Sequence, residues 1–411
     1  MQSRLTRLLP CIALLCAAGA RAQDSELPRY SFNGFGTLGV VHSTEDLADF
    51  TGSDARPNGA GYTRDWAAGV DSLIGAQLDV VFTSRLSAVV QVMSEQNYDD
   101  TYRPHVEWAN VKYQFTPDFS VRVGRTVLLV FRLSDTRKVG FTYPWVRPPL
   151  DLYGLSPIST TDGADASYRL HAGDWTHTLQ LRVGANDTKL PNSGGTVSSR
   201  DIWELSDSVE FGALSAHIAY VKTDVTVPSF NVLFDGFRQF GPQGVAIAEQ
   251  NEVRSAATSF VGIGASFDPG DWFVMGEWGR FDSDSVLGVK TAWYLGGGYR
   301  FAKLTPYVTY SRADADKLSD PGLDVSTLPP QLAAPALGLN AALNDILSQN
   351  VIETTVSAGM RWDFMRNFDL KLQFDHVSVG KGSTGILNNA RPGYQLGGAF
   401  DVFSATIDFV F

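Results

Sequence analysis

The last residues of the chain alternate between apolar and polar side chains. Ser404, Thr406 and Asp408 share one face of an extended strand. The opposite face carries five apolar residues: Phe403, Ala405, Ile407, Phe409 and Phe411. Because successive side chains of a strand point to opposite faces, this segment is expected to have one apolar and one polar face. That pattern is typical of a strand that separates lipid from water.

The same alternation recurs in sixteen segments along the chain. We place them roughly at residues 30–42, 68–82, 84–94, 105–115, 119–129, 163–172, 174–184, 201–212, 213–222, 254–267, 271–282, 289–301, 303–312, 350–364, 366–379 and 399–411. An even number of antiparallel strands is the rule for single-chain bacterial barrels. Sixteen strands enclose an aqueous lumen rather than a packed interior. The predicted fold class is therefore all-β: a transmembrane antiparallel β-barrel.

The connections between these segments alternate between short and long. The short ones are rich in turn-forming residues: Thr83-Ser84, Thr116-Pro117-Asp118, Gly173-Asp174, Gly212-Ala213, Asp268-Pro269-Gly270 and Arg366-Asn367. The long ones fall near 43–67, 95–104, 130–162, 185–200, 223–253, 283–288, 313–349 and 380–398. This is the arrangement of outer-membrane barrels, with short periplasmic turns and long extracellular loops. Residues 333–350 form either a short helix or a plain exterior loop.

Charged residues are expected to face the lumen, because a charge on the lipid face at mid-membrane costs ~2–4 kcal/mol. By alternation, the basic inward positions are Arg85, Lys112, Arg122, Arg169, Arg182, Arg300, Arg361 and Lys371. The acidic inward positions include Asp71, Asp79, Asp165, Glu277, Asp363 and Asp375. Arg125 breaks the pattern because it shares a face with Val123. We expect either a local bulge at Gly124 or a position for Arg125 at the rim.

The N-terminus has the organisation of a secretory signal peptide. Arg4 and Arg7 precede an apolar run, and Ala20-Arg21-Ala22 forms a cleavage site. We assign residues 1–22 to a cleaved signal peptide and residues 23–411 to one barrel domain. Both cysteines of the chain lie in the leader, which excludes a Cys-based catalytic or zinc site in the mature protein.

Charge and hydropathy exclude several other classes of protein. Loss of the three leader arginines takes the net charge from −11 to −14, which argues against a nucleic-acid partner. No later stretch has the 18 apolar residues of a membrane-spanning helix. His171, Asp174 and His177 flank one turn, but this spacing is more readily explained by chance than by a metal site. We expect no enzyme activity, no catalytic or metal-binding residues and no cofactor.

Two segments resemble the trimeric Gram-negative porin superfamily. Val121-Arg122-Val123-Gly124-Arg125 is similar to the strand that leads into the long third loop of these porins. Residues 30–38 resemble a porin first strand, and the terminal Phe411 resembles the signal read by the outer-membrane assembly machinery. The resemblance implies a homotrimer in the Gram-negative outer membrane, in contact with lipid and lipopolysaccharide. It also implies that the third loop folds into the barrel and narrows it.

The corresponding loop here is residues 130–162. It contains prolines and aromatic residues that could pack against a wall, and it is locally basic rather than acidic. The candidate pore-lining residues on the loop are Arg132, Asp135, Arg137 and Lys138. Their counterparts on the wall are Arg85, Lys112, Arg122, Arg169, Arg182 and Arg361. An exterior loop packed against a neighbouring subunit remains the alternative.

These observations predict an outer-membrane channel for the passive diffusion of small hydrophilic solutes, in which lumen charges sort solutes by sign. Two alternatives stay open. One is a substrate-specific channel for small anions, such as organic acids or phosphate, with Arg132 and Arg137 in its binding site. The other is a structural or adhesin barrel in which the surface loops matter more than the pore.

Overall fold

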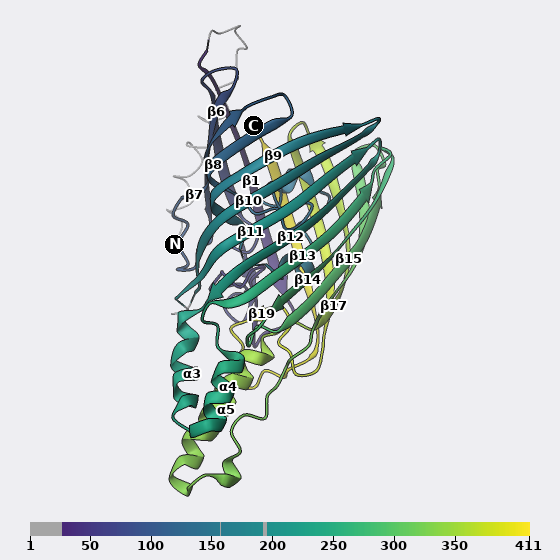
Figure 1. Ribbon diagram of the computed structural model, residues 1–411. Helices are drawn as coiled ribbons and strands as arrows, with labels where there is room; N and C mark the ends of the chain where they lie inside the picture. Colours follow the sequence, from purple (N-terminus) through teal and green to yellow (C-terminus); the bar gives the residue numbers. More distant parts are fainter. Residues whose placement is uncertain (1–26, 157, 192–194) are drawn as a thin grey trace.

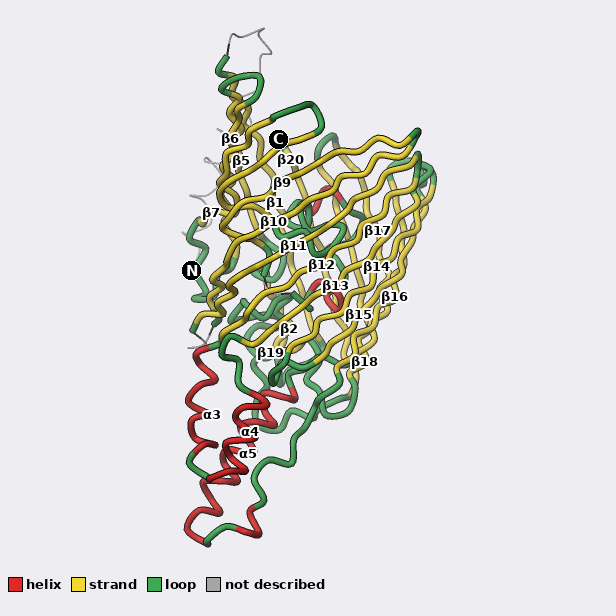
Figure 2. The backbone as a smooth tube through the Cα atoms, viewed as in Figure 1, coloured by secondary structure: helices red, strands yellow, loops and turns green. Residues whose placement is uncertain are grey.

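The computed structural model describes residues 27–156, 158–191 and 195–411. Within them, sixteen long antiparallel strands form one closed barrel (Figures 1 and 2). Its strands are β1 (Arg29–Ser43), β5 (Leu73–Val81), β6 (Leu86–Glu95), β7 (His105–Gln114), β8 (Phe119–Val127), β9 (Thr160–Ala172), β10 (Trp175–Lys189), β11 (Thr196–Phe211), β12 (Leu214–Thr226), β13 (Ala256–Phe267), β14 (Trp272–Ser283), β15 (Val289–Tyr299), β16 (Leu304–Ala315), β17 (Glu353–Met365), β18 (Phe368–Val379) and β20 (Gly398–Val410). The predicted signal peptide lies outside the described residues.

The barrel closes at β1. This strand pairs with β5 from Arg29 to Thr37 and with β20 from Phe35 to Ser43. Phe411 extends the seam, because its backbone N–H and C=O bond the C=O and N–H of Gly34. A Cβ on Gly34 would lie 2.2 Å from the Phe411 ring, so a larger residue there would require this ring to move. With both edges of β1 paired, no strand of the barrel offers a free edge to the membrane.

Side chains alternate across the wall as the sequence pattern predicts. In β20, Phe403 and Ile407 are exposed on the outer face, whereas Thr406 and Asp408 are buried on the inner face. Each of the sixteen predicted segments overlaps one barrel strand. The expected loop at 185–200 is shorter than predicted, because the β10–β11 ladder continues past a register shift at Gly184/Asn186 to the pair Lys189 and Thr196.

Arg125 occupies the outer rim without a bulge. The β7–β8 register runs unbroken from the Ala109–Arg125 pair to the Gln114–Ser120 pair. Gly124 has φ +129, and a Cβ there would lie 2.2 Å from the carbonyl oxygen of Ala109. The Arg125 guanidinium is held by two hydrogen bonds of 2.7 Å to the Asp162 carboxylate. Of the two expectations, the rim position is the one found.

Helices project beyond one end of the barrel, opposite the short turns (Figure 1). They are α3 (Asn231–Arg238), α4 (Gly241–Asn251) and α5 (Pro330–Ser348), which includes most of 333–350. Phe234, Phe237 and Leu343 are buried where these helices pack together. None of the described helices is long and apolar enough to cross a membrane. The remaining elements are β2 (Asp49–Phe50), β3 (Ala60–Gly61), β4 (Trp66–Ala67), β19 (Leu387–Asn388), η2 (Gly140–Thr142), α2 (Leu150–Tyr153), η3 (Pro228–Phe230) and η4 (Val325–Thr327).

Aromatic pairs mark the barrel end that carries the short turns. The rings of Trp175 and Phe211 stack with centroids 4.4 Å apart, beside the β9–β10 and β11–β12 turns. Phe267 and Trp272 lie 5.5 Å apart across the β13–β14 turn. Aromatic side chains of barrels concentrate at the two membrane interfaces, so these pairs locate the periplasmic interface.

Candidate functional site: a loop held inside the barrel

The segment between β8 and β9, described over residues 128–156 and 158–159, lies against inward-facing side chains of the wall. It first contacts β11, where the backbone N–H of Leu129 donates to Glu204 over 3.0 Å. The carbonyl oxygen of Leu129 lies 3.0 Å from Nε2 of His217 on β12. Next, the backbone N–H of Arg132 donates to Glu277 on β14 over 2.8 Å. We call this segment the inner loop.

An apolar cluster joins the inner loop to the wall from β11 to β16. Its loop side chains include Phe131, Trp145 and Leu152, and its wall side chains include Phe260 and Tyr294. Trp145 is 1% exposed. Its indole N–H donates to the Thr309 hydroxyl over 2.8 Å, which satisfies the one polar atom of the side chain. This part of the lumen is therefore packed with side chains instead of water.

Glu277 is the polar centre of that cluster. Its carboxylate accepts hydrogen bonds from the hydroxyls of Tyr153, at 2.6 Å, and Tyr294, at 2.7 Å. The Arg132 backbone supplies a third donor. A buried carboxylate is tolerated when its hydrogen-bonding capacity is satisfied in this way. Glu277 thus binds the inner loop at two points, Arg132 and Tyr153, and also binds Tyr294 on β15.

Arg147 fastens the middle of the inner loop to the opposite side of the barrel. Its guanidinium makes two hydrogen bonds to Asp71, just before β5, at 2.9 and 2.7 Å. It also contacts Asp375 on β18 at 3.3 Å and donates to Ser404 on β20 over 2.6 Å. All four side chains are buried. A fork-shaped guanidinium can satisfy several acceptors at once, so one residue bridges three parts of the wall.

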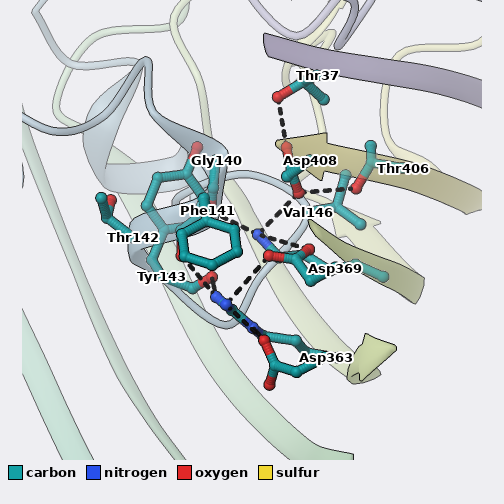
Figure 3. Close-up of polar contacts among 12 residues, drawn as sticks. Thr37, Gly140, Phe141, Thr142, Tyr143, Val146, Asp363, Asp369, Thr406 and Asp408 are labelled. Atoms are coloured by element: carbon teal, nitrogen blue, oxygen red, sulfur yellow. Dashed lines mark hydrogen bonds and ion pairs between the residues drawn. The ribbon is translucent and has the colours of Figure 1, made fainter. Parts of the chain in front are cut away.

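A second polar cluster holds the loop segment 140–143 against β17, β18 and β20 (Figure 3). Lys371 donates to the carbonyl oxygen of Gly140 over 2.6 Å and lies 3.0 Å from Asp408. Arg361 donates to the carbonyl oxygen of Phe141 over 2.7 Å and lies 3.1 Å from Asp369. Lys371, Asp369 and Asp408 are fully buried. These wall charges are therefore occupied in positioning the loop.

The inner loop also reaches β6 at the extracellular end. The Lys138 ammonium lies 2.6 and 2.7 Å from the two carboxylate oxygens of Glu95. Arg56, from the loop between β1 and β5, contacts the same carboxylate at 2.8 Å. One acidic residue thus joins the inner loop, an outer loop and the wall.

The remaining lumen runs along the wall from β5 to β9, and charges of both signs border it. Lys112 and Arg169 face it, and Arg137 faces it from the inner loop; none of the three forms an ion pair with any part of the chain that the structure describes. Asp135 is exposed on the loop. Arg122 is partly neutralised, because its Nε donates to Asp165 over 2.9 Å. Two acids lie on the same strands: Asp79 on β5 accepts hydrogen bonds from Asn33 and Gln77, and Glu107 on β7 lies 3.6 Å from His105.

The candidate residues identified in the sequence do not all border the open space. Lys112, Arg122, Arg137, Arg169 and Asp135 border the open space. Arg361 and Lys138 hold the inner loop, and Arg182 is fully buried between Glu204 and Asp165. Arg132 lies against Met275, with its Nε buried and without a hydrogen-bond partner in the described chain.

The prediction that Arg85 lies on the lumen wall is wrong. It is exposed in the short turn between β5 and β6, because β6 begins one residue later and alternation has no meaning outside a strand. Sequence reasoning also missed Glu95 and Glu204 as partners of the loop. Glu204 has inward parity in the predicted segment 201–212, whereas Glu95 falls at the start of the predicted loop 95–104. The distance of either residue from the inner loop depends on the register between strands.

Comparison with known proteins agrees with this architecture. The sequence model of the Gram-negative porin family matches residues 11–379. No curated protein sequence matches the chain. Among solved structures, OmpF of Salmonella typhi in complex with daunomycin is similar with a TM-score of 0.57 at 12% identity, over 93% of this chain and 98% of that chain.

Two further structures show the same fold similarity. The outer membrane channel DcaP of Acinetobacter baumannii has a TM-score of 0.57 at 12% identity, over 96% of this chain and 100% of that chain. An anion-selective porin from Comamonas acidovorans has a TM-score of 0.51 at 13% identity, over 93% of this chain and 100% of that chain.

Proposed function

Because the chain belongs to the Gram-negative porin family, we propose that it conducts small hydrophilic solutes by passive diffusion through a lumen narrowed by the inner loop. The family and the fold indicate a channel of the outer membrane rather than an enzyme. The observation that carries the proposal is the set of contacts that the inner loop makes with β6, β11, β12, β14, β16, β17, β18 and β20 and with Asp71 before β5. These contacts support a passage on the β5–β9 side.

The unpaired basic side chains supply the selectivity in this proposal. Rings of Arg and Lys favour anions in a pore, and the field of a charge is stronger beside low-dielectric walls than in open water. Lys112, Arg137 and Arg169 provide three such charges, whereas Asp79 on β5 and Asp135 on the loop are the acids without an ion pair on this side of the described barrel. Small anions are therefore favoured over cations.

The reversal potential of single channels under a KCl gradient tests this preference. The purified protein in a planar bilayer is expected to prefer chloride. The double variant Arg137→Gln/Arg169→Gln removes two of the charges and is expected to lower the chloride-to-potassium permeability ratio. Arg366→Gln, in the periplasmic turn between β17 and β18, is the matched control and is expected to leave the ratio unchanged.

A potassium preference in the wild type would contradict the proposal that basic residues set the selectivity. It would not contradict the proposal that the protein is a channel. An equal loss of selectivity in the double variant and in Arg366→Gln would mean that overall charge, rather than these positions, sets the ratio. The electrostatic screening length in salt solution is about 10 Å at 0.1 M and increases as the salt is diluted. The comparison is therefore made at low ionic strength.

One observation favours a more specific channel for small anions. Lys112 and Arg122 are directly opposed cross-strand partners, and like charges in that position repel each other. An anion between them would relieve the repulsion. Inorganic phosphate is then expected to block chloride current saturably, and Lys112→Gln is expected to remove the block. A linear, non-saturating phosphate response in the wild type would leave the channel non-specific.

The finer features of the proposal follow the family. The protein is exported through a cleaved signal peptide, residues 1–22, and assembles as a homotrimer surrounded by outer-membrane lipid and lipopolysaccharide. The short strands β5 to β8 carry exposed apolar side chains on their outer faces, such as Val90, Val111 and Val123. Such surfaces are compatible with either lipid or a neighbouring subunit.

A further inference from the structure

An ionisable pair lies on the outer face of the barrel, where lipid is expected. Nδ1 of His177 on β10 is 2.8 Å from the Asp207 carboxylate on β11. Their neighbours on the same face, Leu179 and Leu205, are exposed apolar side chains. Ionisable residues in contact with the membrane interior are costly and usually serve a function. Neither residue belongs to the passage or to the contacts of the inner loop.

A groove begins at this pair. Asp207 and Val209 line its start, and it continues over β12 to β15 with a volume of about 650 Å³. Its floor is a cross-strand row of three small residues, in which Ala216 pairs with Ala265 and Ala265 pairs with Gly276. His177 pairs with Val209, and Val209 pairs with Ala216. The row therefore leads directly from His177 into the groove.

Larger side chains flank this floor on both sides. Ile218, Ile263 and Trp278 form the adjacent row away from the periplasm. The row on the periplasmic side consists of Leu214, Phe267 and Val274. The groove lies close to the short turns, so it faces the inner leaflet of the membrane.

The dimensions of the groove restrict what can occupy it. The two flanking rows are four residues apart along each strand, about 13 Å between Cα atoms, and their side chains reduce the opening further. A helix with its side chains is about 10–12 Å wide and would not reach the floor. A strand from another protein would find no free edge in a closed barrel. An apolar, flexible chain such as a lipid acyl group is narrow enough to reach the floor and needs no free strand edge.

The ion pair specifies the polar end of the occupant. With Nδ1–H donated to Asp207, Nε2 of His177 is free of partners in the described part of the chain. The carboxylate compensates the charge of the imidazolium form, whose Nε2–H donates to an anion. Two residues from His177, Trp175 belongs to the aromatic pair that locates the periplasmic interface. A phosphate at headgroup level is therefore within the range of the imidazole.

We propose that this groove binds one inner-leaflet phospholipid, with an acyl chain over Ala216, Ala265 and Gly276 and with its phosphate accepting a hydrogen bond from His177. Recognition rests on the phosphodiester, which phosphatidylethanolamine and phosphatidylglycerol share. The site is separate from the proposed conduction pathway, so its test does not depend on the outcome of the channel experiments.

The test uses full-length protein in lipid nanodiscs and native mass spectrometry after gentle removal of bulk lipid. Phosphatidylglycerol and diacylglycerol with identical acyl chains are compared as probes. The wild type is expected to retain phosphatidylglycerol over diacylglycerol by about tenfold, the ratio that corresponds to about 1.4 kcal/mol. His177→Leu is expected to abolish this preference, and Ala265→Leu is expected to abolish retention of both lipids.

Ala166→Leu is the matched control for the groove. Ala166 also faces lipid, on β9, but its cross-strand partners Leu181 and Val121 are large, so no row of small residues passes through it. Equal retention of the two probes by the wild type would overturn the role of His177. Equal losses of lipid retention in Ala265→Leu and Ala166→Leu would overturn the groove as the binding site. A change of oligomeric state in Ala265→Leu alone would identify a subunit contact there and would also overturn the proposal.

Discussion

Replacement of Arg147 by methionine is expected to detach the inner loop from one side of the barrel and to increase single-channel conductance. The substitution keeps much of the side-chain volume but leaves Asp71 and Asp375 buried without their cation. Removal of one partner from a buried ion pair costs about 3–5 kcal/mol. The loop then loses its bridge to β18, β20 and the start of β5. Conductance in planar bilayers and the thermal unfolding temperature measure the two effects.

Arg300→Met is the control for this substitution. Arg300 makes hydrogen bonds of 2.7 Å to both carboxylate oxygens of Asp268, but in an exposed periplasmic position. Exposed pairs contribute about 0–1 kcal/mol, so stability and conductance should hardly change. The triple variant Arg147→Met/Asp71→Asn/Asp375→Asn removes the uncompensated charges and should recover part of the stability. Wild-type conductance and unfolding temperature in Arg147→Met would show that the loop is held by its apolar contacts alone.

Lys371→Met is expected to have a similarly large effect at the loop segment 140–143. Lys371 is fully buried with Asp369 and Asp408, and it is the donor to the carbonyl oxygen of Gly140. Its loss leaves two carboxylates close together in the wall and one loop carbonyl without its donor. We expect a loss of about 3–5 kcal/mol and larger fluctuations of the open-channel current. Differential scanning calorimetry and current-noise analysis are the measurements.

Lys303→Met provides the matched control, because Lys303 is exposed and reaches a backbone carbonyl only at 3.4 Å. Combining Lys371→Met with Arg147→Met tests whether the two anchors hold the same loop. Their effects on conductance should then be less than additive, since the first substitution already releases what the second would release. Strictly additive effects would mean that each anchor controls a separate region.

The strands could be predicted because alternation is a local property. Residues 399–411 show it without reference to any other part of the chain, and β20 forms there. Strand ends are less local. The ladder from Asn186 to Lys189 depends on its pairing with residues 196–199, and neither segment alone has a strong apolar face. The same limit applies to Arg85, which was assigned an inward side although it precedes the first residue of β6.

The roles of the lumen charges were harder to predict than their positions. Parity places Arg122, Arg182 and Arg361 on the inner face, but it cannot distinguish a free charge from a paired one. That distinction depends on which residue stands opposite, such as Asp165 for Arg122. One sequence signal was available and unused. Phe260 and Tyr294 are large apolar residues with inward parity, and they mark the area that the inner loop covers.

The seam of the barrel has a consequence for the order of assembly. β20 supplies Ser404 and Asp408 to the two anchors of the inner loop, and Thr37 of β1 bonds Asp408 across the seam. A chain whose last strand is still unpaired therefore lacks both the closed wall and part of the loop's attachment. Contacts between residues so distant in sequence form late and slowly. Closure of the barrel and attachment of the inner loop to β20 therefore belong to the same final step. A defect at the C-terminal strand would then leave an open sheet with an incompletely attached loop, not a wider pore.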